Sequence, residues 1–218
     1  MSDVRYWIKS KLMENGFTST ILQDHHLQIS RDTFPDVLVV CIGLETGKLF
    51  EADDLRRLAG SSPEAGFVVV VPTRITHAAY ELAEQLGICV AGFGELTNAL
   101  RDDEDVSRHV SSQEKYERRR LTHNSIVRSI KRKGYHAYEV ERVGLRPLRI
   151  VTTNDYELTA DAVYSILENY SEISPDLIVV TNPSCLGFST DSLQAASRAG
   201  IPIVRFGDFL DNLDTSWT

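Results

Sequence analysis

The residues best suited to a chemical task are basic side chains gathered in the second half of the chain. The segment from Glu114 to Ile150 holds eleven Lys and Arg against four Glu, a local charge of about +7 in a chain whose formal net charge is -8. Basic side chains at this density can neutralise the phosphates of a nucleic acid. The candidate nucleic-acid contacts are Arg118, Arg119, Arg120, Arg128, Lys131, Arg132 and Lys133.

The spacing of apolar residues in this segment predicts one amphipathic helix with Ile126, Val127 and Ile130 on its buried side. No aromatic interleaving or base-reading motif accompanies the basic residues, so any DNA binding is expected to depend on phosphates. The segment also fits a solvated helix, or one that docks on acidic residues of the first half, Asp102 to Asp105. The negative net charge excludes a basic coat over the whole protein.

Other residue types capable of chemistry lack a useful spacing. His25 and His26 are adjacent before a predicted strand, so their rings point to opposite faces and cannot share a metal. Cys41, Cys89 and Cys185 are odd in number and far apart, which predicts free thiols in place of a disulfide framework or zinc site. A P-loop, a nucleophile elbow and the dinucleotide-binding glycine spacing are absent from the sequence. We expect no metal and no cofactor.

An internal repeat organises the chain. Phe67 to Leu100 reads as strand, helix, short strand and helix, and the same unit returns from Leu177 to Leu213. Gly87, Phe93 and their neighbours recur at one constant offset. The repeat predicts two α/β domains with mixed sheets, residues 1–104 and 112–218, joined by a polar segment.

The first copy is expected to follow the order α-β-β-β-α-β-α-β-α. Its meander strands are predicted near Phe17 to Leu22, Leu27 to Ile29 and Asp36 to Ile42. The second copy is expected to begin with the basic helix, because Ile8 to Phe17 matches Ile126 to Tyr135. Strands from Tyr135 to Val140 and from Leu145 to Thr152 are expected to follow.

This order of elements resembles the restriction-endonuclease-like fold, particularly the Mrr-type and Holliday-junction-resolvase-like nucleases with a PD-(D/E)xK signature. The likeness covers both copies, with Val68 to Leu96 and Ile178 to Leu210 as the most similar parts. The resemblance implies an αβββαβ core. It also implies a Mg²⁺-dependent endodeoxyribonuclease, in which an acid on one strand and an E-x-K triplet on the next hold the metal and orient water.

The catalytic triplet of that family is missing where the resemblance expects it. The strand before the middle helix reads Val37 to Cys41 in the first copy and Arg149 to Thr153 in the second, and neither has an acid paired with a lysine. A stretched version is offered by Asp36 after a proline, with Glu45 and Lys48. Two residues separate Glu45 from Lys48 and one is a glycine, so a surface turn is favoured over a strand face.

The sequence favours a catalytically degenerate tandem nuclease-fold protein that binds DNA or a protein partner in DNA processing or defence. One alternative is an active Mg²⁺-dependent endonuclease, and another is a Rossmann-like ligand-sensing or oligomeric scaffold. The scaffold would hold its ligand near Pro72-Thr73 and Asn182 to Ser184. Because no apolar run approaches the roughly 20 residues that span a bilayer, we expect a cytoplasmic protein without a membrane partner. The oligomeric state stays open.

Overall fold

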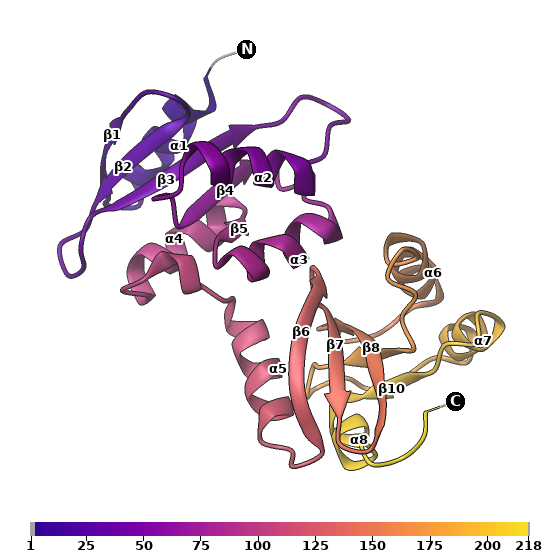
Figure 1. Cartoon of the computed structure of the whole chain (residues 1–218). Coiled ribbons are helices and arrows are strands. Elements are labelled where there is room, and N and C mark those ends of the chain that lie inside the picture. Colours follow the sequence, from indigo (N-terminus) through magenta and orange to yellow (C-terminus); the bar gives the residue numbers. More distant parts are fainter. Residues whose placement is uncertain (1–2, 218) are drawn as a thin grey trace. The chain divides into compact units, whose positions relative to one another are not determined.

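The computed structural model describes residues 3–217 and divides the chain into two compact units, Met1–Ser112 and Gln113–Thr218 (Figure 1). The elements of the first unit are α1 (Val4–Glu14), β1 (Thr18–Ile21), β2 (His26–Ser30), β3 (Val37–Gly43), α2 (Ala52–Ser61), β4 (Phe67–Val71), α3 (His77–Leu86), β5 (Cys89–Ala91), α4 (Phe93–Asp102) and the short 3-10 helix η1 (Val106–Arg108). Those that follow are α5 (Ser112–Thr122), β6 (Val127–Gly134), β7 (Ala137–Arg142), β8 (Leu145–Thr153), α6 (Ala160–Asn169), β9 (Leu177–Val180), α7 (Thr190–Arg198), β10 (Ile203–Arg205) and α8 (Phe206–Asp211). Apart from η1, both halves have the order α-β-β-β-α-β-α-β-α.

Each unit contains one five-stranded sheet with its strands in chain order, β1-β2-β3-β4-β5 and β6-β7-β8-β9-β10. In both sheets the first three strands are antiparallel neighbours, and the last three are parallel to one another. The parallel pairs require crossover helices, which α2, α3, α6 and α7 provide. The prediction of an α/β fold with mixed central sheets is therefore confirmed.

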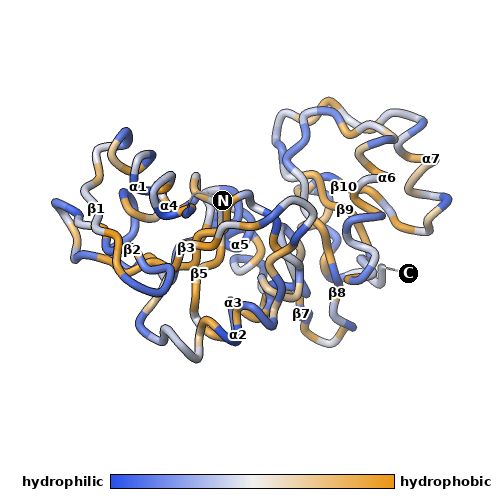
Figure 2. The backbone as a smooth tube through the Cα atoms, turned by 90° about the horizontal axis from the view of Figure 1, so that it is seen from above, coloured by the Kyte–Doolittle hydropathy of each residue, from blue (hydrophilic) through white to orange (hydrophobic). Residues whose placement is uncertain are grey.

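Helices cover both faces of each sheet. In the first unit, α1 and α4 pack on one face through residues such as Ile8 and Leu96, while α2 and α3 pack on the other through Leu55 and Ala83. In the second unit, α5 and α8 share one face, and α6 and α7 share the other. The continuous apolar run of β4 follows from burial on both sides. Figure 2 shows hydrophobic colour concentrated along the central strands.

The start of the second unit differs from the sequence prediction. Helix α5 ends at Thr122, and residues 127–134 form the edge strand β6, so a helix through Lys133 is wrong. A β-bulge between Val127 and Ser129 turns Val127 and Ile130 to the same face of β6, which imitates helical spacing. The structural counterpart of α1 is consequently α5, and the match between Ile8 to Phe17 and Ile126 to Tyr135 is wrong.

The polar segment after α4 packs on the first unit. Val106 lies in its core, and the imidazole of His109 is buried between two carboxylates. The Nδ1 atom of His109 lies 2.5 Å from Asp103 Oδ2, and its Nε2 atom lies 2.8 Å from Glu95 Oε2. The boundary between the compact units falls after Ser112, so residues 105–111, which lie between the two domains predicted from the sequence, belong to the first unit.

The three cysteines are free thiols. Cys41 lies in the core on β3, and burial raises the pKa of its thiol to about 12. Because the thiolate is the nucleophile, we expect Cys41 to react with a disulfide reagent at pH 8 at least ~100-fold more slowly in the native protein than after unfolding. A variant carrying Cys89→Ala and Cys185→Ala isolates this reaction in a spectrophotometric time course. Equal rates in native and denatured protein would contradict the burial of this thiol.

Candidate functional site

The structure does not bring the stretched nuclease signature together. Asp36 immediately precedes β3, whereas Glu45 and Lys48 flank a turn beyond its far end, as their spacing indicates. With about 3.3 Å of rise per residue, Asp36 and Glu45 lie roughly 25–30 Å apart. All three side chains are exposed, and Asp36 accepts hydrogen bonds from Gln28 and Ser30. Between residues 3 and 217, no group of three or more His, Cys, Asp or Glu side chains is arranged to hold a metal ion.

The predicted nucleic-acid contacts are divided between two elements. Helix α5 carries Arg118, Arg119 and Arg120, while strand β6 carries the remaining four. On β6, Arg132 faces α5, whereas Lys131 pairs with the strand β7 residue Glu141. Successive side chains of a strand point to opposite faces of the sheet, so β6 separates the basic side chains that one helix was expected to present on the same surface.

Two of the arginines neutralise a buried acid. Glu114 on α5 is only 4% exposed, and the Arg118 Nε donates to its Oε1 at 2.8 Å. The Arg132 Nη2 lies 3.5 Å from the other oxygen of Glu114. The Arg118 guanidinium also lies over the ring of Tyr138, 5.6 Å from its centroid. Arg118 and Arg132 therefore stabilise the buried carboxylate of Glu114 in the second unit.

Most other basic residues of the segment have internal partners. The Lys131 Nζ lies 2.5 Å from Glu141 Oε1, and this hydrogen bond raises the pKa of Lys131 and lowers the pKa of Glu141. Arg149 pairs with Glu139, and Arg146 with Asp176. Of the acids in these pairs, only Asp176 lies outside the segment and lowers its local charge, because the glutamates are already counted in the value of about +7. Most of the excess positive charge of the segment therefore remains.

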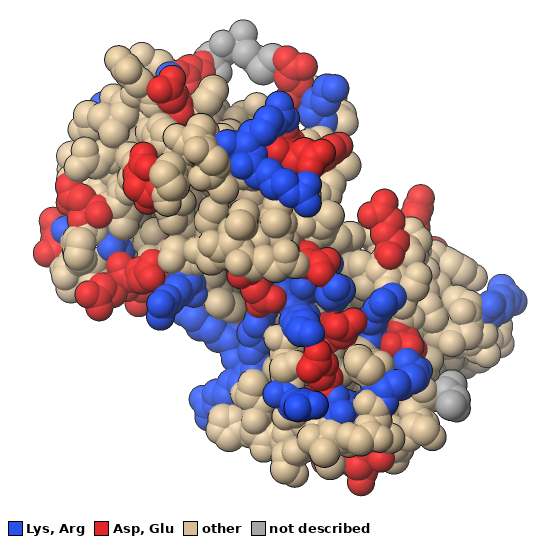
Figure 3. All heavy atoms as spheres, viewed as in Figure 1, with Lys and Arg blue, Asp and Glu red and all other residues tan. Residues whose placement is uncertain are grey.

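Three predicted contacts stay available at the surface. Arg119, Arg120 and Arg128 are exposed and form no ion pair with the residues that the structure describes. Arg119 and Arg120 lie in the last turn of α5, next to each other. Figure 3 shows Lys and Arg side chains gathered over this helix. The exposed basic surface is therefore centred on the end of α5.

Beneath α5 lies a polar cluster that sequence reasoning missed. Glu117 is fully buried, and its Oε2 accepts hydrogen bonds from Tyr138 Oη at 2.9 Å and Thr152 Oγ1 at 3.0 Å. Its Oε1 accepts one from Gln113 at 2.9 Å. Burial, followed by the nearby carboxylates, raises the pKa of Tyr138 well above its usual value. Since Glu117 is inaccessible, this cluster supports the fold and does not contact a substrate in this conformation.

The same positions are apolar in the first unit. The pairing register of the strands aligns the two sheets with each other. The helices are aligned by a buried leucine one turn after each residue compared, Leu12 after Ile8 in α1 and Leu121 after Glu117 in α5. The corresponding pairs are Glu117 and Ile8, Tyr138 and Leu27, and Thr152 and Cys41. The spacing of Glu114, Glu117 and Leu121 on one helical face is the sequence signal that could have revealed the burial of these acids.

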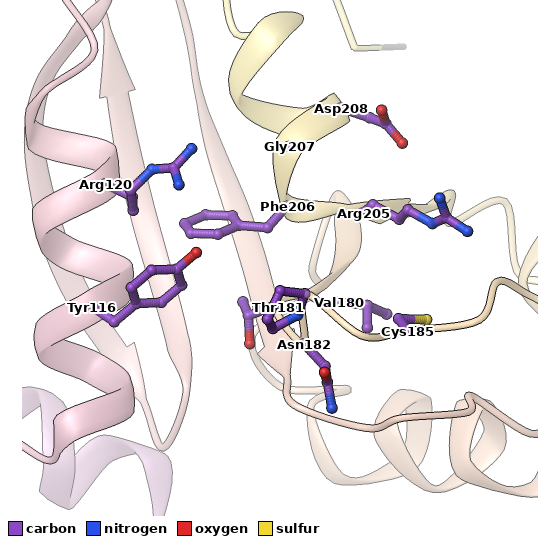
Figure 4. A pocket seen from close by; sticks show the side chains of 11 residues that line it. Tyr116, Arg120, Val180, Thr181, Asn182, Cys185, Arg205, Phe206, Gly207 and Asp208 are labelled. Carbon is purple, nitrogen blue, oxygen red and sulfur yellow. The ribbon is translucent and has the colours of Figure 1, made fainter.

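A pocket of about 270 Å³ opens in the second unit at the carboxyl ends of β9 and β10 (Figure 4). Tyr116 and Arg120 line it from α5, Asn182 lines it from the loop after β9, and Arg205 and Phe206 line it where β10 meets α8. The rings of Tyr116 and Phe206 meet edge to face with centroids 5.9 Å apart. Carboxyl ends of parallel strands are frequent ligand sites in α/β proteins.

In the part of the chain that the structure describes, no helix is long and apolar enough to cross a membrane. The ligand-scaffold alternative expects a ligand near Asn182, and this residue lines the pocket together with Arg120. No family model, curated protein or solved structure matches this chain.

Proposed function

We propose that this chain is a tandem protein of the restriction-endonuclease-like type that binds nucleic-acid phosphates without cutting them. The observation that carries the proposal is the exposed pair Arg119 and Arg120 at the end of α5, which has no acidic partner among the described residues. Guanidinium groups bind phosphate through paired N–H donors. An unneutralised pair on an otherwise acidic protein directs an anionic ligand to this surface.

The repeated order of elements and the mixed sheets support the resemblance to a nuclease fold. The arrangement of carboxylates supports a binding role over hydrolysis. Asp36 and Glu45 lie at opposite ends of β3, and the strand between them presents apolar residues. Metal-assisted hydrolysis requires two or more oxygen ligands around one ion, and these two acids cannot supply them together.

Fluorescence anisotropy with labelled duplex DNA tests the binding role. The logarithm of affinity should fall with the logarithm of salt concentration by about 0.9 per phosphate contacted. The double variant Arg119→Ala, Arg120→Ala should flatten this slope by about 2 and weaken duplexes of unrelated sequence by similar factors. Arg118 is retained because its loss would remove a charge-assisted hydrogen bond from the buried acid Glu114.

The matched control is Arg56→Ala with Arg57→Ala, two exposed arginines of α2 that pair with Asp53 and Asp54. This control should leave the salt slope unchanged. An identical slope for wild type and the α5 variant would exclude these arginines from binding. Absence of binding by wild type at low salt would favour the protein-partner or ligand-scaffold alternative.

Plasmid and branched DNA are expected to stay intact in the presence of Mg²⁺ or Mn²⁺. Gel electrophoresis after prolonged incubation measures nicking. Metal-dependent cleavage that Asp36→Ala or Glu45→Ala abolishes would establish the endonuclease alternative and reject the binding-only proposal. Cleavage that copurifies with the protein and survives both substitutions would also reject the binding-only proposal and would indicate an endonuclease that uses a different set of acids.

A further inference from the structure

The pocket at the ends of β9 and β10 has the size of a small ligand site. Its volume of about 270 Å³ lies just below the range of roughly 300–1,000 Å³ that is usual for drug-sized ligands. It suits one nucleotide unit better than a dinucleotide cofactor. Its walls mix charged, polar and aromatic groups, which is the composition that fixes the orientation of a bound molecule.

Two cations and one anion line the pocket. Arg120 and Arg205 are exposed, and neither forms an ion pair with residues 3–217. Asp208 adds one carboxylate, which can accept hydrogen bonds from hydroxyl or amino groups. The charge balance favours a ligand that is anionic at one end and carries hydrogen-bond donors elsewhere.

The floor of the pocket is held in place before any ligand arrives. The Asn182 Nδ2 donates to the Asn154 carbonyl at 3.1 Å, and its Oδ1 accepts from the Ser184 backbone N–H at 2.9 Å. Thr181 is buried and donates through its hydroxyl to the Thr153 carbonyl at 3.1 Å. A fixed floor reduces the entropy that binding would otherwise cost.

An aromatic surface completes the pocket. Tyr116 is 40% exposed, and it packs edge to face on Phe206, which is nearly buried. Figure 4 shows Tyr116 and Arg120 extending from α5 beside Phe206, whereas the Arg205 side chain extends away from that ring in the opposite direction. The half-exposed ring of Tyr116, with the Arg120 guanidinium beside it, can stack on a nucleobase of any sequence.

The first unit differs from the second at this corner. It retains the aromatic pair, as Trp7 and Phe93 meet with centroids 5.3 Å apart. Gly92 precedes Phe93 in the first unit, and Arg205 holds the corresponding position before Phe206. A Cβ atom at Gly92 would lie 2.1 Å from Thr73 Oγ1. Thr73 thus occupies the space that an arginine side chain would need. The second unit has a longer loop there, from Thr181 to Ser189, and carries the arginine.

We infer that this pocket binds one nucleotide, with Tyr116 stacking on the base and Arg205 contacting the phosphate. The inference rests on the proposed nucleic-acid function, because Arg120 belongs both to the basic end of α5 and to the pocket. The nucleotide is either the phosphorylated end of a strand or a free nucleoside monophosphate, and the two sources share the same base and phosphate chemistry.

The test uses the full chain and the variants Arg205→Gln and Tyr116→Ala. Three labelled DNA probes are a single strand with a 5′ phosphate, the same strand without it, and a closed dumbbell duplex without ends. Arg205→Gln should weaken the phosphorylated strand about tenfold and leave the dumbbell unchanged. Tyr116→Ala should weaken both single strands by about tenfold or more. Arg198→Gln, an exposed arginine of α7, is the matched control.

Competition identifies the source of the nucleotide. Displacement of the single strand by AMP, CMP, GMP or TMP at equal affinity would assign the pocket to free nucleotides, whereas weak displacement would assign it to strand ends. If Arg205→Gln and Tyr116→Ala both bind every probe as wild type does, the nucleotide site is rejected. Binding of the dumbbell duplex by wild type would still support the proposed function in that case. If dumbbell binding is lost only in the double variant of Arg119 and Arg120, the proposed phosphate-binding function is supported independently of the nucleotide site. Failure of wild type to bind any of the strands or monophosphates would reject the nucleotide site.

Discussion

Glu117→Ile is expected to lower the free energy of unfolding of the second unit by about 2–4 kcal/mol. The substitution installs the residue that the first unit has at the same position, Ile8. It also removes the acceptor of the Tyr138 hydroxyl, which is fully buried, and that of the Gln113 amide. A buried donor without an acceptor has lost its hydrogen bonds to water and forms none with the protein, which lowers the free energy of unfolding.

Exchange of the whole cluster should reverse most of this loss. The triple variant Glu117→Ile, Tyr138→Leu, Thr152→Cys gives the second unit the apolar set of the first. Removing both partners of a buried hydrogen bond can be nearly neutral, so we expect the triple variant to be more stable than Glu117→Ile alone. The smaller leucine leaves some space, and full recovery is therefore not expected.

Urea unfolding followed by tryptophan fluorescence measures both variants. The chain has two tryptophans, Trp7 in the first unit and Trp217 in the second, so a Trp7→Phe background makes Trp217 the single reporter. Trp217 packs on Phe209 of the same core. Glu168→Ile, an exposed acid on α6, is the control and should change stability little. A triple variant no more stable than Glu117→Ile would contradict the assignment of a hydrogen-bonded cluster.

Arg142→Met should destabilise the second unit by about 2–4 kcal/mol and loosen its C-terminal segment. Arg142 is only 4% exposed, and its Nη1 donates to the carbonyl oxygens of Leu213 at 2.9 Å and Thr215 at 2.6 Å. Its Nε and Nη2 donate to the carbonyl oxygen of Arg146. Methionine fills similar space but leaves these three carbonyl groups without their donors.

The same Trp217 background reports this loss, with a red-shifted native emission as the additional expected sign. Arg142→Lys should recover little, because one ammonium cannot reproduce the fork of the guanidinium. Arg149→Met, on the neighbouring strand at an exposed position, should have a small effect. Similar unfolding midpoints for Arg142→Met and Arg149→Met would show that the carbonyl contacts contribute little.

Burial on both faces of a parallel sheet leaves a local signature, so the repeated half of each unit could be predicted from sequence. Runs such as Phe67 to Val71 and Leu177 to Val180 are apolar at every position because helices cover both sides. Crossover helices with an apolar stripe follow each run. The paired β-α-β-α units and the mixed sheets follow from these patterns and from the rule that parallel strands need long connections.

Residues 127–134 show what only tertiary structure decided. Their apolar residues fit a helix face as well as a bulged strand, and pairing with β7 selects the strand. The fate of the basic charges likewise depended on partners distant in sequence, since Arg146 pairs with Asp176 and Arg142 caps carbonyl groups beyond Leu210. Local sequence carries periodicity and charge, whereas the pairing of an edge strand, the neutralisation of a charge and the burial of Glu117 depend on contacts that form only when the chain folds.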